Sequence, residues 1–182
     1  AGTAQDERTA LIVYRREASV EGPRQICRIP LFTDKGSAVE ISPIGWGRAL
    51  VVKNDAGYRS AFHGTSEAKI PGGIWRIDIR EDDSGCDVLW QAPERVPAVV
   101  NKLSSNGLLY YYTFEEQPDG ENAWFFVTLD FVTGNVAYKQ FIGLGQKFDI
   151  NWGSPAIAKD GTVYLGILEG IIQIADGSAE GE

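Results

Sequence analysis

The feature that most constrains this chain is a recurring unit of short apolar strands separated by tight turns. Its clearest copy is Ser154–Gly177, in which Lys159-Asp160-Gly161 and Glu169-Gly170 interrupt apolar, β-branched segments. Asp-Gly readily adopts the positive φ angles that two-residue hairpin turns require. The strands predicted in this copy are Ser154–Ala158, Thr162–Leu168 and Ile171–Ala175. Three strands alone are marginally stable, so we expect this unit to be one part of a repeat.

The same alternation of strands and turns recurs upstream. We predict strands at Thr9–Arg15, Gln25–Phe32 and Ser37–Ile41, then at Arg48–Lys53, Tyr58–His63, Gly73–Ile79 and Cys86–Gln91, and then at Ala98–Leu103, Leu108–Phe114, Ala123–Asp130 and Asn135–Ile142. A unit of roughly 45–50 residues with four strands has the period of a β-propeller blade. The sequence therefore predicts an all-β chain with about three and a half four-stranded blades.

An arc of this size does not close. Propellers typically need about four to eight blades, and an open arc leaves strand edges bare. We therefore expect a complementary chain, the N-terminal half of the propeller from the same precursor, to complete the ring. The alternative is that two copies of this chain close one ring. We assign residues 1–177 to one propeller domain and residues 178–182 to a short acidic tail.

Composition narrows the partners and the origin of the chain. The net charge of −8 argues against nucleic acid and anionic membrane surfaces, since both require a positive footprint. No apolar run approaches the ~18 residues of a membrane span. The chain has no Met and begins Ala1-Gly2, so we expect it to be the C-terminal product of a processed larger protein.

The two cysteines, Cys27 and Cys86, lie in the first and second units. They form no CxxC motif and no Cys/His cluster, which argues against a zinc site. If the protein is secreted or periplasmic, we expect a disulfide linking the two units; otherwise they are two buried thiols.

The last unit resembles the repeat of pyrroloquinoline-quinone-type (PQQ-like) propellers. The matching residues are Ala158, Asp160-Gly161-Thr162-Val163-Tyr164, Gly166, Gly170, Ala175 and Asp176. Leu129-Asp130 followed by Thr133-Gly134 is similar to the blade ending of that family. The resemblance covers about 25 residues well and the third unit in part. It implies a propeller, but not the quinone cofactor, whose calcium-ligand set is not found in this sequence.

More broadly, the chain is similar to a group of uncharacterised secreted bacterial propeller proteins. The similar stretches are Val51–Tyr58, Arg76–Trp90, Val99–Phe131 and Gly161–Gly177. This resemblance implies export and implies no activity.

Candidate site residues follow from topology, because the innermost strands of a propeller converge on one channel mouth. We expect a small molecule or a partner to bind there. The polar residues at these strand ends are Lys53, Asn54, Asp55, Asn101, Asp149 and Asn151. Of these, Asn54, Asp55, Asn101 and Asn151 could hold Ca²⁺. The alternative function is a metal-assisted hydrolase, similar in ligand placement to gluconolactonase- or paraoxonase-type propellers. The alternative to a metal site is ordinary turn chemistry, in which the Asn and Asp side chains hydrogen-bond to their own backbone.

Four further residues complete the predicted site. A channel-facing Lys102 could act as a base or nucleophile, and His63 is a weaker candidate base that also fits a loop position. Trp46 and Trp152, each flanked by Gly, could stack on a ligand or lock the repeat. The aromatic segments Tyr110–Tyr112 and Trp124–Phe126 place aromatics on both faces of their strands, as expected for packing between blades.

Overall fold

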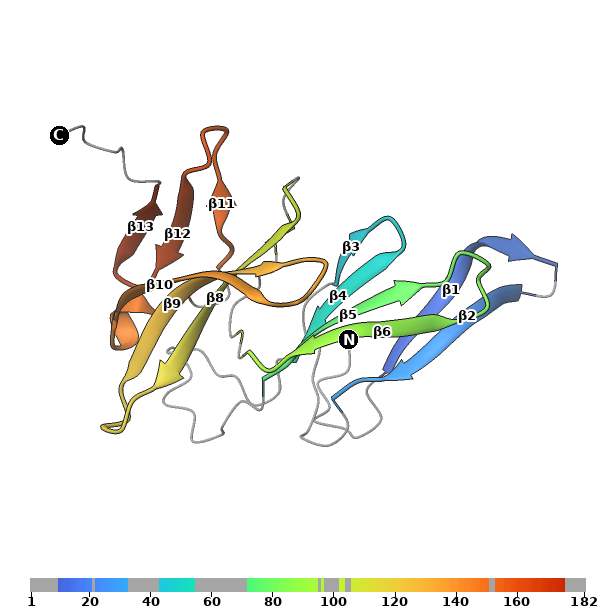
Figure 1. Cartoon of the computed structure of the whole chain (residues 1–182), viewed down its shortest axis with the longest axis horizontal. Helices are drawn as coiled ribbons and strands as arrows, with labels where there is room; N and C mark the ends of the chain where they lie inside the picture. Colours follow the sequence, from blue (N-terminus) through green and yellow to red (C-terminus); the bar gives the residue numbers. More distant parts are fainter. Residues whose placement is uncertain are drawn as a thin grey trace.

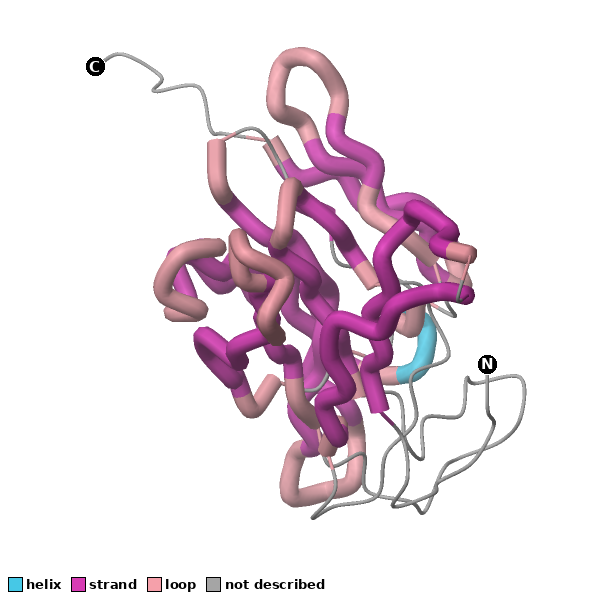
Figure 2. Tube along the Cα trace, turned by 90° about the vertical axis from the view of Figure 1, so that its right-hand side faces the viewer, coloured by secondary structure: helices cyan, strands magenta, loops and turns pink. Residues whose placement is uncertain are grey.

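The chain folds into four antiparallel sheets, each built from strands that are consecutive in the sequence (Figure 1). The computed structural model describes residues 10–20, 22–32, 43–54, 72–94, 96, 102–103, 106–150 and 153–175. Among these residues there is no α-helix, and the one helical turn is the 3-10 helix η2 (Gln146–Phe148), cyan in Figure 2. An all-β architecture was predicted, and the structure confirms it.

The strands follow the predicted order. The first sheet contains β1 (Ala10–Ser19) and β2 (Gly22–Pro30), and the second contains β3 (Ile44–Trp46), β4 (Ala49–Lys53), β5 (Ile74–Ile79) and β6 (Cys86–Ala92). The third contains β7 (Lys102–Leu103), β8 (Leu108–Glu116), β9 (Asn122–Asp130) and β10 (Val136–Leu144). The fourth contains β11 (Ala156–Ile157), β12 (Val163–Ile167) and β13 (Gly170–Ile174).

The second sheet differs from its prediction in one respect. Its first strand is Ile44–Trp46, whereas we expected Arg48–Lys53 to come first. Gly47, at a φ of 58°, makes the tight turn that brings Ile44 opposite Val51. A three-residue strand that contains one glycine, Gly45, and is followed by another, Gly47, carries little pattern, which is why the sequence did not reveal it. The predicted strands Tyr58–His63 and Ser37–Ile41 lie outside the described residues.

Each sheet packs face to face on the next one along the chain. Val52 and Ile77 of the second sheet bury against Leu31 and Phe32, which follow β2. On the opposite face, Val51 joins a second cluster. Its buried members are Val51, Ile74, Ala92, Val96, Leu109, Tyr111, Val127 and Leu129. Adjacent residues of a strand point to opposite faces, so Val51 and Val52 serve two different interfaces.

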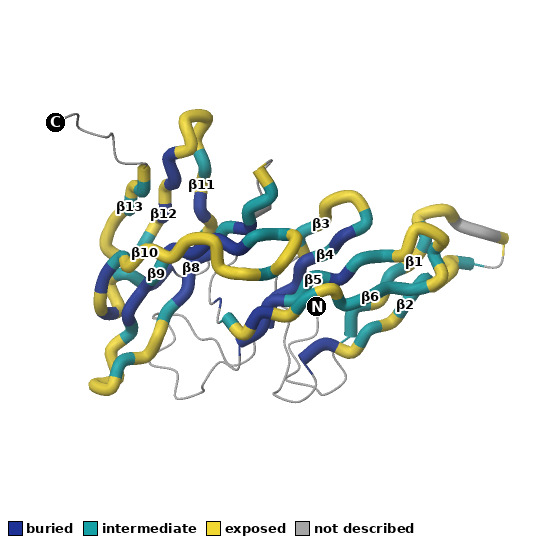
Figure 3. Tube along the Cα trace, viewed as in Figure 1, coloured by how far each residue is buried: buried dark blue, intermediate teal, exposed yellow. Residues whose placement is uncertain are grey.

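The two central strands of the third sheet, β8 and β9, are likewise buried on both faces, as their dark segments in Figure 3 show, whereas the edge strand β10 is mostly exposed. Tyr111 faces the second sheet, while Tyr112 faces the fourth. The interface with the fourth sheet is the aromatic one. Its buried members are Tyr112, Trp124, Phe126, Ile150, Val163 and Leu165. The expected packing of aromatic side chains between sheets is therefore confirmed.

The sheets share one direction. The turns between first and second strands, β3–β4 and β11–β12, project from the same side of the molecule in Figure 1. We call this side the hairpin end. The opposite side, the loop end, carries the β8–β9 turn and the ends of β4 and β6. The first strand of each sheet thus begins at the loop end.

Within the part of the chain that the structure describes, no helix is long and apolar enough to cross a membrane. The predicted domain boundary after residue 177 falls outside the described residues.

Candidate functional site

The loop end carries the two predicted polar ligands that the structure describes fully. Asn54 follows β4 and is 1% exposed, and Asp149 follows η2 and is 6% exposed. The Asp149 main chain is fixed by two hydrogen bonds, one from its N–H to Gln146 and one from the Leu168 N–H to its carbonyl. Asp149 precedes β11, the first described strand of the fourth sheet, whereas Asn54 follows β4, which is the second strand of its sheet and not the first as we expected.

Asn54 takes part in a backbone network that joins three strand ends. Its N–H donates to the Gly73 carbonyl at 2.9 Å, and its side-chain amide donates to the Gly72 carbonyl at 3.4 Å. The Gly73 N–H donates in turn to the carbonyl of Glu94, beyond β6. The side-chain bond spans 18 positions, so it ties two strand ends together and is not the local turn bond that we weighed against a metal-binding role for Asn54.

Most of the other predicted residues lie outside the described residues. These are Asp55, His63, Asn101, Asn151 and Trp152. For Lys102 the structure describes only the backbone, which pairs with Tyr110 at the start of β7. Their predicted roles as ligands, base or nucleophile stay predictions.

Trp46 lies at the other end of the molecule. It ends β3 at the hairpin end, is half exposed, and stacks on Phe131 with ring centroids 5.9 Å apart. The Arg76 guanidinium lies 4.1 Å from the centroid of the same Phe131 ring. The structure therefore does not bring Trp46 together with Asn54 and Asp149. Trp46 pairs with Ala49, and Asn54 lies five residues further along the chain, directly after β4, which corresponds to about 16 Å of extended strand.

A groove that sequence reasoning missed opens at the loop end between the second and third sheets. Its volume is about 360 Å³, and its lining is Pro93, Glu94, Thr113, Phe114, Glu115 and Glu116. Pro93 and Glu94 follow β6, whereas the other four residues form the end of β8. The signal available in the sequence was that two strands end in acidic residues. Nothing in the sequence showed that those two ends meet.

A buried phenol stands behind this groove. Tyr111 lies two residues before Thr113 on β8 and is fully buried, with its hydroxyl next to the Glu94 carboxylate. Burial, and then the nearby Glu94 carboxylate, raise the pKa of the Tyr111 hydroxyl well above its ordinary value. On the opposite face of β8, burial and then the Asp149 carboxylate do the same for the pKa of Tyr112, whose hydroxyl donates to the Phe148 carbonyl.

No group of three or more His, Cys, Asp or Glu side chains within the described ranges could hold a metal ion. The predicted Ca²⁺ site rests largely on residues outside those ranges, so it stays a prediction.

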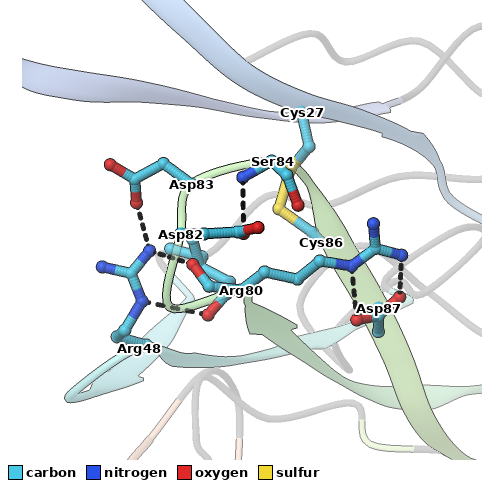
Figure 4. The surroundings of a disulfide bond; sticks show 9 residues. Cys27, Arg48, Arg80, Asp82, Asp83, Ser84, Cys86 and Asp87 are labelled. Atoms are coloured by element: carbon cyan, nitrogen blue, oxygen red, sulfur yellow. Dashed lines mark hydrogen bonds and ion pairs between the residues drawn. A yellow bond between two sulfur atoms is a disulfide. The ribbon is translucent and has the colours of Figure 1, made fainter.

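The predicted disulfide is present. Cys27 on β2 and Cys86 on β6 are bonded, which joins the first sheet to the second (Figure 4). The turn that leads into Cys86 is held from several sides. Asp83 pairs with Arg15 at 2.6 Å and with Arg48.

The rest of this turn is fixed by polar contacts of its own. Arg80 pairs with Asp87 at 2.6 Å, and the Ser84 N–H donates to Asp82 at 2.9 Å. These contacts, drawn in Figure 4, fix the conformation of the turn.

No protein-family model matches this sequence, and no match was found among curated proteins.

Proposed function

We propose that this chain is part of an exported β-propeller whose ring is completed by further sheets on another polypeptide, and that the assembly binds a small molecule or a partner at the loop end. The observation that carries this proposal is the stacking of four antiparallel sheets in chain order with one shared direction. Propeller blades stack in this way around a channel. The PQQ-like pattern of the last unit supports the same interpretation.

The outer face of the fourth sheet supports an incomplete ring. Val163 and Leu165 pack on the third sheet, so Tyr164 and its cross-strand neighbours face away from it. This outer face consists of Ala156, Tyr164, Gly166, Ile171 and Gln173, and none of these side chains is charged. Ile171 is 76% exposed and Tyr164 is 40% exposed. A sheet face that is permanently exposed to water normally carries polar and charged side chains. The lack of charged side chains on this face therefore favours a covered face.

The fourth sheet also ends in an uncharged edge. Its last described strand is β13 (Gly170–Ile174), whereas the second and third sheets each have a fourth strand. Edge strands are usually protected by charges, Pro or bulges, and β13 has none of these among its residues. A strand from the completing chain is the natural cover.

Export is supported by the disulfide, because such bonds persist in oxidising compartments. A binding function is favoured over catalysis because the sequence contains no catalytic motif such as a nucleophile elbow, while the loop end offers a groove.

The test is native mass spectrometry of the protein purified from its natural source, before and after denaturation. The proposal expects this chain to travel with a second polypeptide that separates on denaturation. A stable monomer would overturn it, and a dimer of this chain alone would replace the partner with a second copy.

A further inference from the structure

The turn that leads into β8 carries a reactive sequence whose chemistry the proposed function does not use. Asn106 precedes Gly107 there, and no other asparagine in the chain is followed by glycine. Asn106 is exposed, and Gly107 has a φ of 77°, a backbone conformation that favours glycine. The pair therefore combines an accessible side-chain amide with a following backbone nitrogen that no Cβ shields.

The Asn106 side chain folds over its own turn. Its Oδ1 accepts a hydrogen bond from the Leu108 N–H at 3.3 Å, and its Nδ2 donates to the Tyr110 hydroxyl at 3.4 Å. A bond of the first kind is typical of Asn in turns, and here it keeps the side-chain amide close to the backbone of Gly107 and Leu108. The Leu108 N–H also stabilises negative charge on the amide oxygen, which makes the amide carbon, Cγ, a better electrophile.

This arrangement suits an intramolecular acyl transfer, because the two reacting groups are held in one turn. The Gly107 nitrogen forms a bond to Cγ of Asn106, and the side-chain nitrogen leaves as ammonia with the proton that the Gly107 nitrogen gives up. The product is a succinimide. Water then opens this ring: attack at Cγ gives aspartate, and attack at the main-chain carbonyl carbon gives isoaspartate. Water is the only co-reactant, and nothing is oxidised or reduced.

The other described asparagines that reach the surface lack this geometry. Asn122 begins β9, where the backbone is extended, and the buried Ala123 follows it. Asn135 is exposed, but Val136 follows it, and the branched Cβ of a valine crowds the backbone nitrogen. These two residues are therefore internal controls for Asn106.

The same turn is tied to the junction of the second and third sheets. The Gly107 carbonyl accepts a hydrogen bond of 2.9 Å from the Phe131 N–H, and the Phe131 carbonyl accepts one each from Trp90 and Arg76. Isoaspartate would insert a methylene into the main chain just before Gly107. It would also add a carboxylate near Asp130, which lies across from the start of β8, and like charges on paired strands are destabilising.

We propose that Asn106-Gly107 is a site of spontaneous covalent modification. Succinimide formation converts Asn106 to isoaspartate and aspartate, and the isoaspartate loosens the bond between Gly107 and Phe131. This inference is independent of the proposed function, because the reaction takes place within one turn of the third sheet and needs no partner.

The experiment is peptide mapping of the disulfide-intact protein after several weeks at body temperature in a mildly alkaline buffer made with heavy-oxygen water. Opening of the succinimide places a heavy oxygen atom in the new carboxyl group, and electron-transfer fragmentation separates isoaspartate from aspartate. We expect label at Asn106 to accumulate about tenfold faster than at Asn122 or Asn135, because only Gly107 leaves the attacking nitrogen unshielded. Absence of label at Asn106, or equal label at all three residues, would overturn the proposal.

Asn106→Gln is the matched variant. It keeps an amide in the turn, but its longer side chain would have to close a larger ring, so label at this position should fall to the background at Asn122 and Asn135. Circular dichroism melts should show that the aged native protein unfolds at a lower temperature than the fresh protein, whereas aged and fresh Asn106→Gln should agree. Labelling of the native protein without this loss would contradict the link to Phe131. A search for a partner chain by native mass spectrometry has no bearing on either result.

Discussion

The first and last interfaces of the stack are held together in different ways. Between the first and second sheets the buried cluster is small, with Leu31, Phe32, Val52 and Ile77 as its fully buried members. Between the third and fourth sheets the cluster is built on large aromatic side chains, and Tyr112 and Trp124 stack with ring centroids 5.3 Å apart. Among the described residues, the first interface thus buries less apolar volume than the last.

Covalent and polar links accompany the smaller core. The first interface contains the disulfide Cys27–Cys86 and the Asp83 carboxylate, which Arg15 and Arg48 reach from different sheets. Among the described residues, no ion pair joins the third sheet to the fourth. The comparison teaches that a stack of sheets can be secured at one end by a disulfide and ion pairs, and at the other by burial and main-chain hydrogen bonds.

The largest effect is expected from removing the cross-link. The double change Cys27→Ser and Cys86→Ser should lower the free energy of unfolding by about 4 kcal/mol, because the bond spans 59 positions and restricts the unfolded chain. Urea unfolding of the variant, and of the native protein with and without reductant, measures this loss. Hydrogen exchange should rise first in β1 and β2. Uniform acceleration across all four sheets would contradict the idea that the bond secures one interface.

The next largest effect is expected at the interface between the third and fourth sheets. Leu165→Ala should lower the free energy of unfolding by about 3 kcal/mol. Leu165 is fully buried in the aromatic cluster, and its truncation leaves a cavity there. The same loss should be measured with and without reductant, since the disulfide lies at the other end of the stack. Leu89→Ala is the matched control, because Leu89 is 52% exposed and should cost less than about 0.5 kcal/mol.

The strand order could be predicted because each turn carries its own chemistry. Asp160 accepts a hydrogen bond from the Thr162 N–H, and Asp130 accepts one from the Thr133 N–H, so both turns are encoded within four residues. Alternation along β8 likewise predicted that Tyr111 and Tyr112 would face different sheets. Local signals of this kind do not depend on distant parts of the chain.

The candidate site could not be predicted in the same way. Trp46 was assigned to the loop end because the short strand before Gly47 was not recognised, and one unrecognised turn reverses the end at which a residue lies. The groove depends on Glu94 meeting Glu116 across an interface between two sheets. That meeting is set by the packing of Tyr111 and its neighbours, which no local pattern specifies.

A smaller effect is expected on the stability of the protein at low pH. The hydrogen bond from Arg48, and then the charge of Arg15, hold the pKa of Asp83 below its usual range. A lowered folded-state pKa contributes stability above the unfolded value of about 3.9, and this contribution is lost as pH falls through the folded-state value. Asp83→Asn should therefore be less stable than the native protein near neutral pH, with the difference shrinking in acid.

Unfolding by urea at a series of pH values between about 2 and 6 measures this difference. Glu81→Gln is the control on the same turn, since Glu81 is 94% exposed and lies 3.9 Å from Arg48. A constant difference between Asp83→Asn and the native protein at every pH would show that the pairing of Asp83 with Arg15 and Arg48 does not stabilise the first interface.

The last variant, Ile171→Lys, should change the stability of the chain least and its assembly most. Ile171→Lys places a charge on the open face of the fourth sheet, where the side chain is 76% exposed, so the free energy of unfolding of the chain should change by less than about 0.5 kcal/mol. If another sheet covers this face, the buried and unpaired ammonium should prevent association, and native mass spectrometry should then detect the chain without its partner. Val132→Lys is the matched control, because Val132 is 71% exposed on the β9–β10 turn at the hairpin end and should leave the assembly intact. If both variants assemble like the native protein, the uncharged face of the fourth sheet is open to water in the assembly, and the fourth sheet is a true end of the stack.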